Sequence, residues 1–327
     1  MRKLTWRVDT LYTAGAQTIL TDVWGSSSAN VIALGWMSGR HIVYRYNSTT
    51  WTQEPIPPPP APEDRQTVSP NAILGFSPND IWIVGIVGGW SGDTATNGTY
   101  LARYNGSQWQ RWPSPPGMIK WPPGFGFQSI GGTSGSDIWA AGMNIVAHWN
   151  GIEWREVQVP LYPEGMQFLS IAALASNNVY MTGFRNDVTQ PHDTTAYFLY
   201  HYNGVSWTVE DSVILTVFSS TQSFGSQLKG IGTSLFSANN GLWRKAGNSW
   251  VKLRDREVFR VAGTSEENIL SIDSGGKVYH YNGIDWYQLR QFENPDSELR
   301  GIWTDGNEVF IVGFIQGGLK GIVWHGK

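Results

Sequence analysis

The chain has 327 residues, including 18 Trp, 38 Gly and 17 Pro, and it contains no Cys. Its formal net charge is −3 with only 15% charged residues, which excludes general nucleic-acid binding because the field is weak and has the wrong sign. The lack of cysteine excludes disulfide frameworks, cysteine nucleophiles and thiolate metal sites. Abundant glycine and β-forming residues indicate an all-β protein, and 41% hydrophobic residues suffice for a large core.

The N-terminus carries no predicted targeting signal. The basic residues Arg2 and Lys3 are followed by the mixed segment 4–9 rather than by an apolar stretch, so no signal peptide is predicted. No apolar run approaches the roughly 18 residues that a membrane-spanning helix needs. We therefore expect a soluble protein without membrane insertion, in a virion or cell-surface assembly rather than free in the cytoplasm.

An isolated strand is predicted at residues 4–8, and a repeat of about 47 residues (327/7) follows it. The clearest copy has Asp-Ile-Trp at 137–139 and Trp-Asn-Gly-Ile-Glu-Trp at 149–154. Asn-Gly between aromatic residues predicts a tight hairpin turn with positive φ at both central positions. Clusters of Ser, Thr, Gly and Asp mark the other turns. Each copy is therefore predicted to form four short strands, A to D.

The copies predict a single domain over residues 1–327. Tryptophans close six copies, at positions 51, 109, 154, 207, 250 and 286, and the last copy lacks a D strand that the N-terminal strand can supply. The sequence thus predicts an all-β, seven-bladed β-propeller with four-stranded antiparallel blades, whose ring is closed by the N-terminal strand completing the last blade. The predicted blades are 18–57, 70–113, 127–160, 168–212, 227–255, 257–291 and 298–327 together with 4–9.

The repeat resembles a group of bacterial and phage-associated tandem-repeat β-propeller proteins. The resemblance rests on Asp-Ile-Trp at 80–82 and 137–139 and on Tyr-Asn-Gly-x-x-Trp at 104–109, 202–207 and 281–286. It covers nearly the whole chain and implies the propeller fold, but it implies little about activity. A sialidase-type Asp-box is rejected at 271–275, because Lys277 and Val278 stand where Thr and Trp are expected.

All long connections are predicted on one face of the ring, where the B–C turns and D–A crossovers lie. Binding residues concentrate on loops that a rigid scaffold holds, which makes this the predicted functional face. Exposed aromatic side chains there suit stacking on sugar rings or burial against a protein, although they could instead pack onto their own blades. The candidate ligand-binding residues of this face are Trp36, Trp90, Asp93, Trp121, Phe125 and His192.

A second candidate site lies at the start of the innermost A strands. The aligned copies place these residues at one position: Asp22, Ala72, Ser129, Ser170, Lys229, Arg260 and Arg300. We expect Lys229, Arg260 and Arg300 to form a basic arc at the channel mouth on the long-loop face. Arginine offers bidentate hydrogen bonds to carboxylate or phosphate, so the arc predicts an anion site. The alternative is that Asp22 pairs with Arg300 and that the other two cations are solvated.

The histidines do not predict a metal site. His148, His201 and His280 share one C-strand position with arginines of other copies, at positions 45, 103 and 244. Members of one repeat position lie on separate blades and cannot converge on a metal, and arginine is no metal ligand. We expect hydrogen bonds within or between blades at this position.

No cofactor and no catalytic residue is predicted. Acidic residues of the long loops could supply a glycosidase carboxylate pair, although none has a recognisable catalytic context: Glu63, Asp64, Asp93, Asp187 and Asp193. The favoured interpretation is a non-enzymatic recognition propeller that binds a glycan or surface polymer through the long-loop face. The first alternative is a structural protein of a virion or surface appendage, which contacts other subunits. The second alternative is a carbohydrate-active enzyme.

Overall fold

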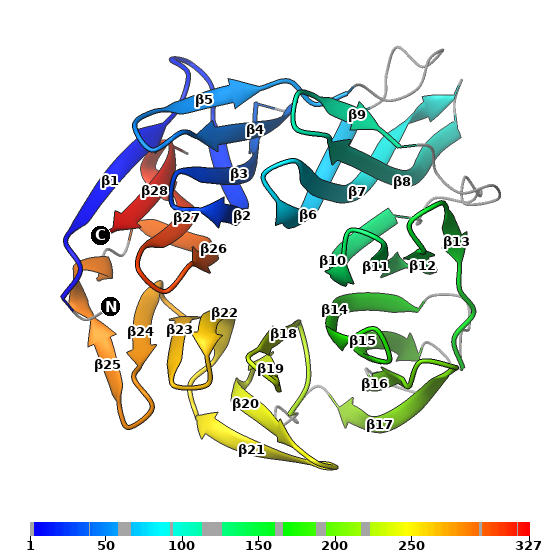
Figure 1. Ribbon diagram of the computed structural model, residues 1–327. Helices are drawn as coiled ribbons and strands as arrows, with labels where there is room; N and C mark the ends of the chain where they lie inside the picture. Colours follow the sequence, from blue (N-terminus) through cyan, green and yellow to red (C-terminus); the bar gives the residue numbers. More distant parts are fainter. Residues whose placement is uncertain are drawn as a thin grey trace.

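The computed structural model describes residues 3–38, 40–57, 67–91, 94–112, 126–160, 166–187, 194–216, 223–293, 296–318 and 320–327. Within these ranges the chain forms antiparallel β-sheets and two short 3-10 helices, η1 (Arg290–Phe292) and η2 (Gln316–Gly318). Figure 1 shows the sheets standing as blades around a central opening, with the first strand of each blade innermost. This arrangement is a β-propeller.

Five blades are separate four-stranded antiparallel sheets. The first has β2 (Thr18–Ser27), β3 (Asn30–Met37), β4 (Arg40–Tyr46) and β5 (Trp51–Glu54). The second has β6 (Thr67–Ser77), β7 (Asp80–Ser91), β8 (Thr94–Tyr104) and β9 (Trp109–Arg111). Two more have β18 (Gln227–Ile231), β19 (Ser234–Asn239), β20 (Gly241–Ala246) and β21 (Ser249–Arg254), then β22 (Val258–Ser265), β23 (Asn268–Asp273), β24 (Lys277–Tyr281) and β25 (Trp286–Leu289). The last has β26 (Ser297–Thr304), β27 (Val309–Ile315), β28 (Lys320–Gly326) and β1 (Trp6–Leu11).

The remaining eight strands form one continuous sheet. They are β10 (Gly126–Ser134), β11 (Asp137–Met143), β12 (Ile145–Trp149), β13 (Trp154–Glu156), β14 (Gln167–Ala175), β15 (Asn178–Asp187), β16 (Thr194–Tyr202) and β17 (Trp207–Thr216). Met143 at the end of β11 pairs with Gln167 at the start of β14, and the Asn144 N–H donates to the Met166 carbonyl (2.9 Å).

The prediction of seven separate four-stranded blades is therefore wrong. The structure has five such blades, and the bridge from β11 to β14 joins the other strands into an eight-stranded sheet. The repeat predicts which strands follow one another along the chain. It carries no information on whether two neighbouring units approach closely enough for their backbones to pair.

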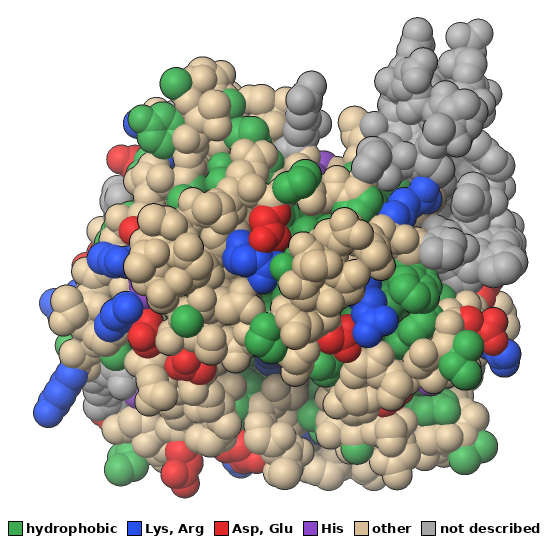
Figure 2. All heavy atoms as spheres, turned by 45° about the horizontal axis from the view of Figure 1, so that its top comes forward, with side chains coloured by type: hydrophobic (Ala, Val, Ile, Leu, Met, Phe, Trp, Pro, Cys, Tyr) green, Lys and Arg blue, Asp and Glu red, His purple; other side chains and the backbone are tan. Residues whose placement is uncertain are grey.

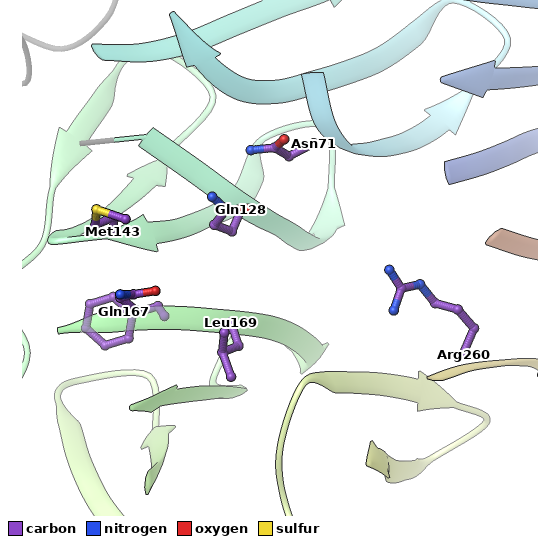
Figure 3. A pocket seen from close by; sticks show the side chains of 7 residues that line it. Asn71, Gln128, Met143, Gln167, Leu169 and Arg260 are labelled. Carbon is purple, nitrogen blue, oxygen red and sulfur yellow. The ribbon is translucent and has the colours of Figure 1, made fainter. Parts of the chain in front are cut away.

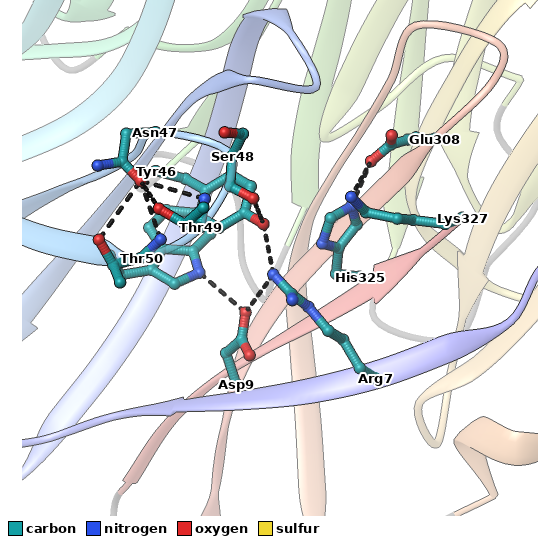
Figure 4. A network of polar contacts seen from close by, with 11 residues as sticks. Arg7, Asp9, Tyr46, Asn47, Ser48, Thr49, Thr50, Glu308, His325 and Lys327 are labelled. Atoms are coloured by element: carbon teal, nitrogen blue, oxygen red, sulfur yellow. Dashed lines mark hydrogen bonds and ion pairs between the residues drawn. The ribbon is translucent and has the colours of Figure 1, made fainter.

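The N-terminal strand closes the ring, as predicted, although it spans Trp6–Leu11 rather than residues 4–8. It pairs antiparallel with β28 from Trp6↔Gly326 to Leu11↔Gly321. On its outer side, Arg7 donates to the Tyr46 hydroxyl (2.5 Å) and Asp9 accepts from Trp51 Nε1 (3.1 Å) (Figure 4). These two contacts join β1 to the β2–β5 blade, so the strand links both ends of the ring.

The predicted Asn-Gly hairpins are present, but their turns differ from the two-residue type I′ turn. Between β12 and β13 the turn has four residues, in which Asn150 Oδ1 accepts from the N–H groups of Ile152 and Glu153 (both 3.0 Å). Only Gly151 has a positive φ, 92°. The asparagine side chain therefore replaces a backbone acceptor, which is its common role in turns. The arrangement recurs at Asn47, Asn105, Asn203 and Asn282.

The arginine and histidine side chains at the shared C-strand position form the hydrogen bonds within or between blades that the sequence predicts. Each side chain contacts the first residue of the B strand in its own blade: Arg45 to Asn30 (2.7 Å), Arg103 to Asp80 (2.8 Å), His148 to Asp137 (2.8 Å), His201 to Asn178 (3.0 Å) and His280 to Asn268 (2.8 Å). Arg244 instead reaches Glu266 of the next blade (3.0 Å). The structural interpretation of these histidines is confirmed.

The core lies between neighbouring blades. Trp82 of β7 is fully buried, and its ring lies 5.3 Å from Trp149 and 5.7 Å from Trp154 of the next unit, centroid to centroid. Trp139 of β11 likewise contacts Trp207 at 5.2 Å. Aromatic pairs at such distances stabilise beyond the area that they bury. Many of the tryptophans therefore hold blades together, and they are not free for ligand binding.

Candidate functional site

The inner strands enclose a central channel of about 400 Å³. Three of its described lining residues are charged: Asp22 from β2, Lys229 from β18 and Arg260 from β22. The other described lining residues are uncharged. The channel therefore carries one positive charge more than it carries negative charge.

A second cavity of about 400 Å³ adjoins the channel at the end where the long connections attach. It is lined by Asn71, Gln128, Met143, Gln167, Phe168, Leu169 and Arg260. Asn71, Gln128, Leu169 and Arg260 line both cavities, so this channel mouth opens into the channel. Figure 3 shows Arg260 reaching from β22 toward the opening, across from the side chains of the other strands. The mouth thus offers three side-chain amides and one guanidinium, with no carboxylate among its described lining residues.

A β-bulge near the start of the inner strand shapes the mouth. In six of the inner strands the pairing with the second strand shifts register there, after Leu20, Pro70, Phe127, Phe168, Val258 and Leu299. At three of these bulges the extra residue, Asn71, Gln128 or Leu169, lines the mouth. A bulge redirects side chains in this way because it interrupts the strict alternation of a strand.

The residue after the bulge joins neighbouring blades. In three inner strands its side chain accepts a hydrogen bond from a backbone N–H of the next inner strand, and Gln227 does the same in β18. The pairs are Asp22 with Ile73 (3.3 Å), Ser129 with Ile171 (3.1 Å), Ser170 with Leu228 (2.8 Å) and Gln227 with Val261 (2.8 Å). We call these contacts the blade clamps. The Asp22 carboxylate is thus held by backbone donors, since Val23 also donates to it (2.9 Å).

The two channel cations have few partners. Lys229 makes no hydrogen bond or ion pair within the described part of the chain, and Arg260 donates only to the Phe259 carbonyl (2.8 Å). Burial within the ring lowers the pKa of both cations, and Asp22 opposes that shift. Burial likewise raises the pKa of Asp22, with Arg260 as the main opposing charge. Lys229 is open to the channel solvent, yet the surrounding walls desolvate its charge.

The predicted aromatic platform is described only in part. Trp36 lies half-buried on β3, and Trp90 lies on β7, where it pairs with Ala95. The Trp90 side chain lies outside the described residues, as do four predicted residues in full: Asp93, Trp121, Phe125 and His192. The strands next to Trp90 are long, because β7 continues to Ser91 and β8 begins at Thr94.

The predicted basic arc is spread over different levels of the channel. Strand pairing places Gln227, rather than Lys229, level with Arg260, so Lys229 lies two residues farther along its strand. Arg300 occupies a bulge and forms an ion pair with Glu298 rather than with Asp22. Arg260 and Lys229 line the channel, whereas Arg300 is not among the lining residues.

Sequence reasoning missed the amides of the mouth, Asn71, Gln128 and Gln167. The available signal was a polar residue directly before the aligned A-strand position, as Asn71 and Gln128 both are. The alternation of side chains along a regular strand predicts that such a residue points away from the mouth. The bulge adds one residue to the strand, so that this residue and those before it face the opposite side from the one predicted.

The described part of the face in Figure 2 shows no comparable excess of one charge. On the described part of the face in Figure 2, Lys and Arg side chains lie beside Asp and Glu among many neutral groups. No helix among the described residues has the length and apolarity needed to cross a membrane.

No family model and no curated protein matches the chain. Solved structures do match it. YCF48 bound to D1 peptide is similar over 98% of this chain and 94% of its own, with 12% identity and a TM-score of 0.62. Virginiamycin B lyase from Staphylococcus aureus with quinupristin is similar over 98% and 99%, with 13% identity and a TM-score of 0.55. BBS1N in complex with ARL6DN is similar over 98% and 94%, with 12% identity and a TM-score of 0.53.

These likenesses show the fold alone. The chain is a β-propeller. Because the identities are low, neither the peptide binding of one neighbour nor the lyase activity of another passes to this chain. The similarity of the repeat to bacterial and phage-associated propellers stays a prediction.

Proposed function

We propose that the protein is a non-catalytic binding module, which engages a macromolecular partner with the face that carries the channel mouth. The observation that carries this proposal is the mouth cavity of about 400 Å³ lined by Asn71, Gln128, Gln167 and Arg260. Side-chain amides both donate and accept hydrogen bonds, and a guanidinium donates in a fixed geometry. A concave site with a few converging polar groups is typical of ligand recognition.

The acidic residues of the two cavities favour binding over glycoside hydrolysis. Hydrolysis uses two carboxyl groups about 5–10 Å apart. Asp22 is the one carboxylate among the described residues that line the channel or its mouth, and backbone N–H groups already occupy it. A binding role needs no second carboxylate.

A protein segment is the first candidate partner. Two solved neighbours of this fold carry a peptide or a protein partner, which supports the same use of the scaffold here. A glycan or surface polymer, the partner predicted from the sequence, is the second candidate, supported by the half-buried Trp36 of β3. A role in virion or appendage assembly is a special case of protein binding.

Binding of the purified protein to peptide and glycan arrays tests the proposal. We expect Gln128→Ala and Gln167→Ala each to weaken the binding of whichever array member is retained, because each removes a hydrogen-bonding amide from the mouth. Gln108→Ala is the matched control, since Gln108 is exposed in the turn between β8 and β9 on the opposite face.

A partner that binds the opposite face of the ring would contradict the proposal. Ile152 and Val205 are 82% and 87% exposed at the tips of its turns. Binding that resists both mouth substitutions but is lost in Ile152→Ser or Val205→Ser would place the partner there. Turnover of an array glycan would contradict the non-catalytic role.

A further inference from the structure

The channel holds two cations that have no carboxylate partner among the described residues, and we infer that it binds an oxyanion, a carboxylate or a phosphate group, at Arg260 and Lys229. This inference rests on the proposed function and names the chemistry that its site recognises. Both side chains line the channel, and Arg260 also lines the mouth, so a group that enters from the long-loop face meets Arg260 first.

The free donors distinguish Arg260 and Lys229 from several other cations of the blades. Three arginines, for example, are paired with carboxylates: Arg45 with Glu54 (2.5 Å), Arg103 with Asp80 (2.8 Å) and Arg244 with Glu266 (3.0 Å). Within the described residues, neither Arg260 nor Lys229 has such a partner. Guanidinium and ammonium groups together leave several N–H donors directed at the solvent of the channel.

Asp22 offsets only part of the charge of this site. It faces the same channel, but no ion pair joins it to either cation among the described residues, and its oxygens accept from Val23 and Ile73. The channel walls partly desolvate the two cations, and a bound oxyanion would replace the hydration that they lose. The surplus charge inside the ring therefore favours an anionic ligand.

The cavity admits more than one source of the oxyanion. About 400 Å³ accommodates a small free anion, and the open mouth also admits the acidic side chain of a partner polypeptide, with its backbone against the mouth amides. Both sources present the same chemistry to Arg260, which favours bidentate contact with planar or tetrahedral oxyanions.

Isothermal titration calorimetry at low ionic strength tests the inference, with inorganic phosphate, succinate, tetraglutamate and tetraglutamine as probes. If the ligand is a small free anion, we expect phosphate and succinate to bind. If it is an acidic side chain of a partner, we expect tetraglutamate to bind and tetraglutamine not to bind. We expect Arg260→Gln and Lys229→Gln each to lower the association constant about tenfold or more, because each removes charge-assisted hydrogen bonds. Arg155→Gln is the control, since Arg155 is exposed on β13 and distant in the fold from the channel.

The outcomes separate the sources. Binding of phosphate or succinate alone identifies a small free anion, and binding of tetraglutamate alone identifies an acidic side chain of a partner. No binding by any acidic probe, or binding that Arg260→Gln and Lys229→Gln leave unchanged in folded protein, overturns the inference. Array binding that still depends on Gln128 would then leave the proposed function standing.

Discussion

Asp273 is fully buried at the end of β23, and Arg254 is the main cation that stabilises its charge. Arg254 of β21 forms an ion pair with it, while the guanidinium lies over the rings of Tyr279 (3.8 Å) and Trp286 (4.7 Å). Ser271 donates a further hydrogen bond to the carboxylate (2.8 Å). Burial raises the pKa of Asp273, and Arg254 is the main charge that opposes this. The residue of the rejected Asp-box is thus structural.

Arg254→Met should lower the free energy of unfolding by about 3–5 kcal/mol, because it leaves the Asp273 carboxylate buried and unpaired. Urea unfolding measures the change. Arg155→Met, at an exposed arginine, should stay within about 0.5 kcal/mol of the parent. Adding Asp273→Asn to Arg254→Met should recover part of the loss, since the buried charge is then absent. A double variant no more stable than Arg254→Met would contradict this account.

His41 gives the molecule a specific pH dependence. It lies near the start of β4 with Nε2 3.0 Å from the Ser69 hydroxyl of the next blade, and burial lowers its pKa from 6.5 to about 4. The unfolded chain therefore binds more protons than the folded chain between pH 4 and 6.5. The contribution of neutral His41 to stability is complete above this window and is lost as the pH decreases through it.

The difference in unfolding free energy between the parent and His41→Gln should therefore shrink as the pH falls from 7 to 4. Urea unfolding across this range measures it, and NMR titration gives the pKa of His41 directly. An NMR value near 6.5 would show that the imidazole is solvated and would remove the expected pH effect.

At the scale of the strand, the blade clamps set the spacing of the inner strands. Ser170 of β14 is buried and accepts from the Leu228 N–H (2.8 Å), so Ser170→Ala should cost about 1–3 kcal/mol by leaving that N–H without an acceptor. Ser212→Ala, at an exposed position of β17, should have an effect within about 0.5 kcal/mol. Equal stability of the two variants in chemical denaturation would show that water replaces the clamp.

The same strands show what the sequence predicts and what it does not. Turn residues such as Asn150 and Gly151 marked the hairpins because their chemistry is local, and the C-strand position of His148 was assigned correctly because it repeats. The prediction that Lys229 and Arg300 share one channel position with Arg260 is wrong. The pairing of the β18 blade shows no bulge, and Arg300 is itself the extra residue of a bulge. A bulge changes which side a residue faces without changing composition, so only the backbone shows it.

At the scale of the whole molecule, the bridge between β11 and β14 and the closure by β1 make the ring uneven. The backbones of Met143 and Gln167 pair at the mouth, whereas the other neighbouring inner strands contact each other through side chains and the blade clamps. The backbone pairing therefore ties two neighbouring units together beside Gln167 in the proposed binding face. On the other side of the ring, its geometry depends on β1 holding the β26–β28 strands against the β2–β5 blade.

Deletion of residues 1–11 tests this dependence on ring closure. It removes the pairing with β28, the burial of Leu11, the partial burial of Trp6, and the contacts of Arg7 and Asp9 with the next blade. Burial of Leu11 alone accounts for about 1.5–3 kcal/mol, and the half-buried Trp6 and the strand pairing add to it, so we expect a loss of about 3 kcal/mol or more. Thermal and urea unfolding measure it.

Deletion of residues 1–3 is the control, because Thr5 and the backbone hydrogen bonds that it exchanges with Lys327 (2.7 and 2.9 Å) remain. A synthetic peptide of residues 1–13 should restore the stability of the longer deletion in a concentration-dependent way, since ligands of the folded state stabilise it by mass action. Rescue by the peptide would show that β1 stabilises the ring by pairing with β28, whether or not it is covalently joined to the chain. If the longer deletion unfolds like the parent chain, the blades hold the ring without β1, and closure by the N-terminal strand has no energetic role.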